Sequence, residues 1–318
     1  MIKQVKEVLL FVFGLTLLAY CSPKDSKDSS QDLKQKQIDP LKEGIVEVKT
    51  RGMEFIVADT LYSGWNQLVY ENESAEVHFI LMDYYPEGKT IEDNKREVLP
   101  PFEIGMKNII EGQMEEAIAA FGKLPEWFFQ VQYHGGTGLI SPGQTAKSTI
   151  FLSPGLYLME CYVKAANGEW HTSHGMIKQI IVLDSPSSMT APVHNNSISI
   201  SSTDGIQLAN DPTEGNQVLE VSFQDQKVYE HFVGHDVNLV RYENGASLDT
   251  LQYWLNWMNP TGLRTPAPQG FTFLGGMNNL DGDKKGYFEA ELLPGNYVLI
   301  SEVPEAGKKN LMLSFTIN

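Results

Sequence analysis

The sequence has few cysteines and few basic residues, and each shortage excludes a class of protein. Cys21 and Cys161 are the only cysteines among 318 residues, too few for a scaffold held by disulfides and too far apart in the sequence for a Cys-x-x-Cys redox pair. Lys and Arg number 24 against 40 Asp and Glu, and the formal net charge is −16 at pH 7. Because a surface of that sign repels a polyanion, we expect no nucleic-acid partner.

Long apolar runs are also scarce, and the clearest one lies at the N-terminus, where Val8 to Tyr20 follows two lysines. This run is too short to cross a bilayer comfortably and is typical of a secretory signal, so residues 1–20 are predicted to be a signal peptide. The letters LLAYC, ending at Cys21, resemble a bacterial lipobox, and that resemblance implies an acylated Cys21. The alternative is an ordinary signal peptide followed by an incidental cysteine.

The residues after Cys21 are polar and carry no core-forming side chains, so residues 21–43 are predicted to be a lipidated tether. The lipid would hold the protein on a membrane of the bacterial cell envelope. We expect the outer membrane, and the sequence does not distinguish its periplasmic face from its outer face.

Beyond the tether the sequence is rich in short runs of Val, Ile, Tyr and Phe separated by Gly, Pro, Asn and Asp. Strands at such short spacing favour antiparallel sandwiches. Two amphipathic helices are predicted among them, one with apolar residues at helical spacing from Met106 to Phe121 and one between Ser247 and Pro260. The predicted fold class is therefore all-β, with helical insertions that pack on the core.

An internal repeat divides these strands into two sets. LSPGLYLMECYV at 152–163 aligns with LLPGNYVLISEV at 292–303, and the order of the other aligned segments is the same in both copies. Repetition at this length predicts two tandem Greek-key β-sandwich domains rather than a solenoid. The predicted first domain, Ser-, Pro- and Asn-rich linker, and second domain are residues 44–184, 185–197 and 198–318.

A second sign of the repeat is a pair of glycines in each copy. HGG at 134–136 aligns with LGG at 274–276. We predict a turn at HGG in which glycine adopts a positive φ, and not an oxyanion loop, because no serine in a nucleophile-elbow motif accompanies it.

Four metal donors of soft or borderline character lie in the first copy. His78 starts an apolar strand, Cys161 ends a later strand, and the loop that follows carries His171 and Met176. A thiolate, two imidazoles and a thioether suit both Cu(I) and Cu(II). Since exported proteins seldom keep an unpaired thiol, we predict one copper site here, with His174 as an alternative ligand.

In these residues the chain resembles the cupredoxin family. Asn72 and His78 look like that family's approach to its first copper ligand, and Cys161, His171 and Met176 look like its ligand loop. The resemblance implies that His78, Cys161 and His171 bind copper equatorially. It implies that Met176 binds axially. It further implies electron transfer or copper handling, with a redox protein or a copper donor as partner, and both copies would be cupredoxin-like domains.

The second copy lacks these ligands, because Ser301 replaces Cys161 and only His235 remains as the counterpart of His78. No metal is expected there. If His78 is likewise retained for packing alone, the chain is a metal-free tandem β-sandwich lipoprotein used for adhesion, glycan binding or envelope assembly. The candidate contacts in that case would be exposed aromatic residues, namely Trp65, Trp127 and Trp170.

Overall fold

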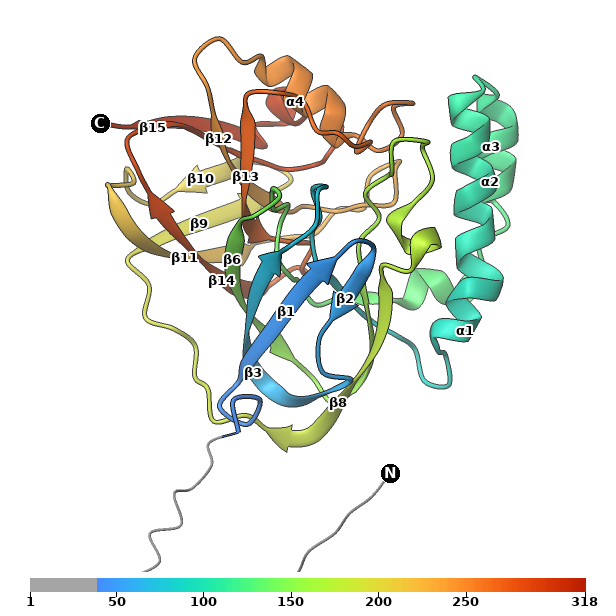
Figure 1. Cartoon of the computed structure of the whole chain (residues 1–318), viewed down its shortest axis with the longest axis horizontal. Helices are drawn as coiled ribbons and strands as arrows, with labels where there is room; N and C mark the ends of the chain where they lie inside the picture. Colours follow the sequence, from blue (N-terminus) through green and yellow to red (C-terminus); the bar gives the residue numbers. More distant parts are fainter. Residues whose placement is uncertain (1–38) are drawn as a thin grey trace, which may run out of the picture. The chain divides into compact units, whose positions relative to one another are not determined.

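The computed structural model describes residues 39–318 (Figure 1). They belong to one compact unit, Ile38–Asn318, and the predicted signal peptide, most of the tether and Cys21 lie outside the described residues. No helix within 39–318 has the length and apolar character needed to span a bilayer.

The strands of the first copy form the two layers around its core. Strand β3 is long enough to belong to both, because its first residues pair with β8 and its later residues pair with β1 and β6. Its side chains alternate between inside and outside, and Leu61, Leu68 and Tyr70 are fully buried. The strands are β1 (Ile45–Arg51), β2 (Glu54–Ile56), β3 (Thr60–Asn72), β4 (Leu81–Tyr84), β5 (Gln132–Tyr133), β6 (Thr145–Leu152), β7 (Gly155–Glu160) and β8 (Ile177–Pro186).

The strands of the second copy also lie in two sheets. One layer contains β10, β9, β11 and β14, and the other is a four-stranded sheet in the order β13-β12-β15-β16. Its strands are β9 (Asn196–Ser201), β10 (Gly205–Leu208), β11 (Gly215–Phe223), β12 (Val237–Tyr242), β13 (Phe271–Met277), β14 (Lys284–Leu292), β15 (Gly295–Ile300) and β16 (Met312–Ile317). The all-β prediction is confirmed.

A continuous sheet joins the two copies. Strand β14 pairs with β11 on one side and with β6 on the other, so the strand order runs β10-β9-β11-β14-β6-β3. The residues predicted as a linker also touch the first copy, since Ser187 donates a hydrogen bond from its hydroxyl to the carbonyl of Trp65. The predicted domain boundaries remain a prediction, because contacts divide the chain only before Ile38.

The helical insertions lie where the sequence predicts them, but the first is not a single helix. It consists of α1 (Ile91–Asp93), a π-helical turn η1 (Asn94–Val98), α2 (Leu99–Ile110) and α3 (Met114–Phe121). Gly112, with φ of +76°, separates α2 from α3 and lets them pack against each other. The prediction of one apolar face from Met106 to Phe121 was therefore wrong in part: Met114 and Ile118 are exposed.

The second insertion is α4 (Leu248–Leu255), whose N-terminus is capped by the Ser247 hydroxyl accepting from the Thr250 N–H. Three 3₁₀ turns complete the structure, η2 (Glu126–Gln130), η3 (His171–His174) and η4 (Ala306–Lys309).

Two of the three tryptophans considered as surface contacts are core residues. Trp127 is 9% exposed and Trp170 is 3% exposed. Trp65 is half-buried and packs against Phe151 and Tyr287. The expectation of an exposed tryptophan surface is wrong for Trp127 and Trp170, as is common for aromatic residues in sandwiches.

Candidate metal centre

Three separate elements position the side chains predicted to bind metal. His78 lies just before β4, where its backbone forms an isolated antiparallel bridge with Ile140. Cys161 directly follows β7, and His171 begins the turn η3. The loop between them is held in shape because the His171 N–H donates to the Val163 carbonyl at 2.8 Å.

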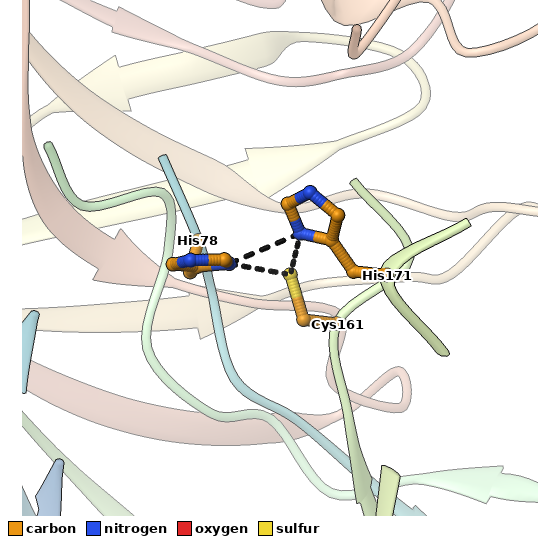
Figure 2. A group of neighbouring side chains, drawn as sticks. All are labelled: His78, Cys161 and His171. Atoms are coloured by element: carbon orange, nitrogen blue, oxygen red, sulfur yellow. Dashed lines mark hydrogen bonds between the residues drawn. The ribbon is translucent and has the colours of Figure 1, made fainter. Parts of the chain in front are cut away.

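These three side chains converge in the core of the first copy (Figure 2). The Cys161 Sγ lies 3.8 Å from the Nδ1 of His78 and 3.8 Å from the Nδ1 of His171, and the two Nδ1 atoms are 3.0 Å apart. All three side chains are fully buried. In the described part of the chain these two imidazole nitrogens and the sulfur lie close enough together to hold one metal ion.

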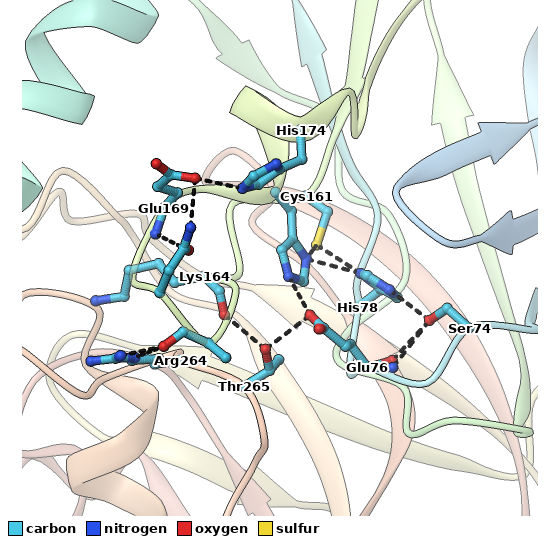
Figure 3. A network of polar contacts seen from close by, with 12 residues as sticks. Ser74, Glu76, His78, Cys161, Lys164, Glu169, His174, Arg264 and Thr265 are labelled. Carbon is cyan, nitrogen blue, oxygen red and sulfur yellow. Dashed lines mark hydrogen bonds and ion pairs between the residues drawn. The ribbon is translucent and has the colours of Figure 1, made fainter.

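The far side of each imidazole ring is held by residues that the sequence analysis did not single out. His171 contacts Oε2 of Glu76 through Nε2 at 2.9 Å, and the Thr265 hydroxyl donates to the same oxygen at 2.9 Å (Figure 3). Thr265 belongs to the second copy, and its N–H donates to the Lys164 carbonyl at 2.8 Å. Both copies therefore contribute to the surroundings of the site.

His78 is oriented by a short chain of hydrogen bonds. The Asn72 amide donates to two backbone carbonyls, so its Oδ1 is the acceptor for the Ser74 hydroxyl at 2.7 Å. Because the Ser74 proton is used in this way, the Ser74 oxygen accepts a hydrogen bond from Nε2 of His78 at 2.7 Å. This network assigns the His78 proton to Nε2 and leaves Nδ1 with a free lone pair.

The same reasoning holds for His171, because Oε2 of Glu76 accepts a hydrogen bond and the ring proton then lies on Nε2. Two Nδ1 lone pairs thus face each other at 3.0 Å, and the single S–H of Cys161 can satisfy only one of them. Lone pairs at this distance repel unless a cation lies between them. The donors present therefore fit a bound metal ion.

Burial sets the protonation of the site before metal binds. It lowers the pKa of His78 to about 3, with the neighbouring His171 adding to the effect, and lowers the pKa of His171 to about 4 against the opposing effect of Glu76. Burial also raises the pKa of the Cys161 thiol to about 12, although hydrogen bonds from the Phe79 and Val163 backbones favour the thiolate. At pH 7 the imidazoles are ready to bind, and a metal must displace the thiol proton.

The remaining two predicted ligands have different surroundings. Met176 is fully buried, and its carbonyl accepts from the Cys161 N–H at 3.1 Å, so its backbone adjoins the site. Its role as an axial ligand stays a prediction. His174 has a side chain that is 36% exposed, forms an ion pair with Glu169 at 3.0 Å, and is not part of the converging group.

The second copy has residues at the positions that correspond to Cys161 and His78, but they do not form a metal-binding group. Ser301 follows β15 as Cys161 follows β7, and His235 precedes β12 as His78 precedes β4. The Ser301 hydroxyl donates to the Asp236 carboxylate at 2.6 Å instead of facing an imidazole. Within residues 39–318 no second group of metal-binding side chains is found.

Comparisons with known proteins give matches to solved structures and to no related sequence. No family model matches the chain, and no curated protein sequence matches it. An auracyanin from Roseiflexus castenholzii is 17% identical with a TM-score of 0.27, covering 44% of this chain and 97% of its own. Auracyanin A from Chloroflexus aurantiacus, titled a "blue" copper protein, is 15% identical with a TM-score of 0.26, covering 44% and 98%. A multicopper oxidase is 11% identical with a TM-score of 0.22, covering 86% and 88%.

Proposed function

We propose that the chain is a membrane-anchored, copper-binding, cupredoxin-like lipoprotein that transfers electrons or handles copper. The observation that carries the proposal is the buried convergence of one thiol and two imidazoles whose Nδ1 atoms lie 3.0 Å apart. Copper, when bound, would supply one-electron redox chemistry. Cys161, His78 and His171 would hold it, with Met176 as a further donor.

The donor set favours copper over zinc. Zinc sites in proteins take four ligands, or three ligands and an open position for water. Here three donors lie in a fully buried site, and the proposed fourth ligand, Met176, would offer a thioether, which is a ligand for copper rather than zinc. A buried site held by Glu76 and Ser74 also changes little in shape when an electron arrives, which favours rapid transfer.

The membrane anchor and the partners belong to the same proposal. The lipobox-like segment ending at Cys21 supports lipid attachment, and the compact unit beginning at Ile38 would then sit on a short tether at the outer membrane. A protein held in this way would exchange electrons or copper with a redox protein or a copper donor in the envelope.

Copper titration of residues 38–318 tests the proposal. Adding Cu(II) is expected to produce intense visible absorption from thiolate-to-copper charge transfer, saturating at one copper per chain. Cys161→Ser should abolish the absorption, because the thiolate is its source. His171→Gln should weaken copper binding by about 100-fold or more, since a ligand is lost outright.

His174→Gln is the matched control, because it removes a histidine three residues away that pairs with Glu169 at the surface. It should keep both the absorption and the stoichiometry. A wild-type protein that stays colourless, or absorption that survives Cys161→Ser, would refute the copper site.

A further inference from the structure

A cavity of about 90 Å³ adjoins the candidate metal centre. Its wall includes Glu160 and Tyr162, on either side of Cys161, and Trp170 and Thr172, on either side of His171. Because neighbouring side chains of an extended segment point to opposite faces, the cavity lies across the backbone from the sulfur. It is therefore a separate space from the metal centre.

Most of the wall is aromatic and comes from both copies. Phe102 of α2 contacts Phe232 with ring centroids 5.8 Å apart and Trp257 with centroids 6.1 Å apart. Tyr85, Phe128 and Trp170 add to the same wall. Such rings present negative π-faces, which attract cations.

The polar groups of the wall include acceptors that have no donor. Oδ1 of Asp83 and Nδ1 of His231 are buried and have no hydrogen-bond partner, and these residues are 4% and 0% exposed. His231 uses its other nitrogen, Nε2, toward the Glu302 carbonyl at 3.4 Å, so Nδ1 is left as an acceptor. Glu160 contributes a second carboxyl group, and neither Lys nor Arg lines the cavity.

We propose that this cavity binds a small primary ammonium ion carrying a short alkyl group. A primary ammonium has three N–H donors, which match the three acceptor groups of Asp83, Glu160 and His231, and its alkyl group suits the aromatic wall. Since a cavity of about 150 Å³ holds benzene, 90 Å³ admits an ion of only a few heavy atoms.

A metal ion fits this cavity less well than an ammonium ion. Asp83 and Glu160 do not join a third His, Cys or acidic side chain within coordinating distance among the described residues. Burial and the neighbouring Glu160 raise the pKa of Asp83 well above its usual value. An ammonium ion beside Asp83 would stabilise the ionised carboxylate without requiring the full set of ligands that a metal needs.

Calorimetric titration of the metal-free full chain with n-propylammonium tests this site independently of copper. Saturable binding at one site is expected, with a Kd in the millimolar range or tighter for so small a ligand. Neutral n-propanol, of similar size, should bind at least tenfold more weakly. Asp83→Asn should weaken propylammonium binding by at least tenfold, because an amide keeps the shape but cannot provide the carboxylate that would pair with the ammonium.

Glu291→Gln, on an exposed residue of β14, is the control and should leave binding unchanged. The proposal is overturned if wild type shows no saturable binding, if propanol binds as well as propylammonium, or if a folded Asp83→Asn protein binds equally well. Should Asp83→Asn fail to fold by circular dichroism, the comparison of the two ligands on wild type decides. Absence of propylammonium binding would not contradict the copper site, and absence of copper binding would not contradict the ammonium site.

Discussion

At the scale of single residues, Glu76 connects the metal centre to the rest of the molecule. Its Oε2 contacts the His171 ring and accepts a hydrogen bond from the hydroxyl of Thr265, which lies 189 positions further along the chain. A carboxylate behind an imidazole fixes the orientation of the ring and keeps the proton on Nε2. It also makes the opposite nitrogen, Nδ1, a stronger metal ligand. Glu76 thereby prepares His171 for a metal.

Glu76→Gln is expected to lower copper affinity by about 10- to 100-fold, because the neutral amide no longer supports the charge of the bound metal. Competition against a chelator of known affinity measures the change. Glu169→Gln makes a matched control, since Glu169 pairs with the surface residue His174 in the same way that Glu76 pairs with His171. Equal affinities for the two variants would show that Glu76 has no special role.

The sequence predicted part of this site and missed the rest for a clear reason. His78, Cys161 and His171 could be grouped because their residue types and strand positions are visible in the chain. Asn72 was already part of the cupredoxin-like pattern before His78, whereas Ser74 and Glu76 were missed because their segment has the composition of an ordinary turn. Thr265 gave no signal, since only the pairing of the two copies brings it to Glu76.

At the scale of elements, the aligned glycine pairs have the same backbone conformation. Gly135 and Gly136 have φ of +80° and +144°, and Gly275 and Gly276 have +94° and +139°. A Cβ on Gly136 would lie 2.0 Å from the Ile80 carbonyl oxygen, and one on Gly276 would lie 2.0 Å from that of Val237. The backbones approach too closely at both places for any other residue.

Gly136→Ala is therefore expected to reduce the free energy of unfolding by more than about 4 kcal/mol, combining a strained φ with a clash against backbone. Gly143→Ala, at φ of +72° with open space around its Cβ, should cost only about 1–2 kcal/mol from strain. Urea unfolding followed by tryptophan fluorescence gives both values. A similar loss for the two variants would remove the role assigned to the close approach.

The prediction of a single helix from Met106 to Phe121 was wrong because the apolar spacing continues through the break between two helices. The apolar spacing from Met106 to Phe121 is regular enough to suggest one helix, yet Gly112 ends α2 and α3 folds back on it. Packing between helices therefore outweighed the local periodicity. The strands were easier to predict, because alternating side chains and Gly- or Pro-rich ends mark each one.

At the scale of the whole molecule, the two copies are held together by more than a linker. β6 and β14 pair across the junction, and the buried Lys164 of the first copy donates from Nζ to the Trp257 carbonyl at 2.8 Å and the Asn259 carbonyl at 3.3 Å. Burial lowers the pKa of Lys164 to about 7, with nearby Arg264 adding to the effect.

We expect residues 38–318 to unfold in one cooperative transition, and the isolated segment 44–184 to be less stable by roughly 3 kcal/mol or more. Separation would expose the edge of β6, the contact of Trp65 with Tyr287 and the aromatic wall shared with Trp257. Urea curves from circular dichroism and fluorescence should coincide for 38–318. Two resolved transitions, or an isolated segment of undiminished stability, would mean that the copies are independent.

The hydrogen bond from Thr265 to Glu76 places the last support of the metal centre far along the chain. His78, Cys161 and His171 all precede that threonine in the sequence. A chain truncated after residue 184 would keep all three metal-binding side chains but lose this support, and we expect it to hold copper less tightly. Copper affinity in the first copy would then depend on whether the second copy is intact.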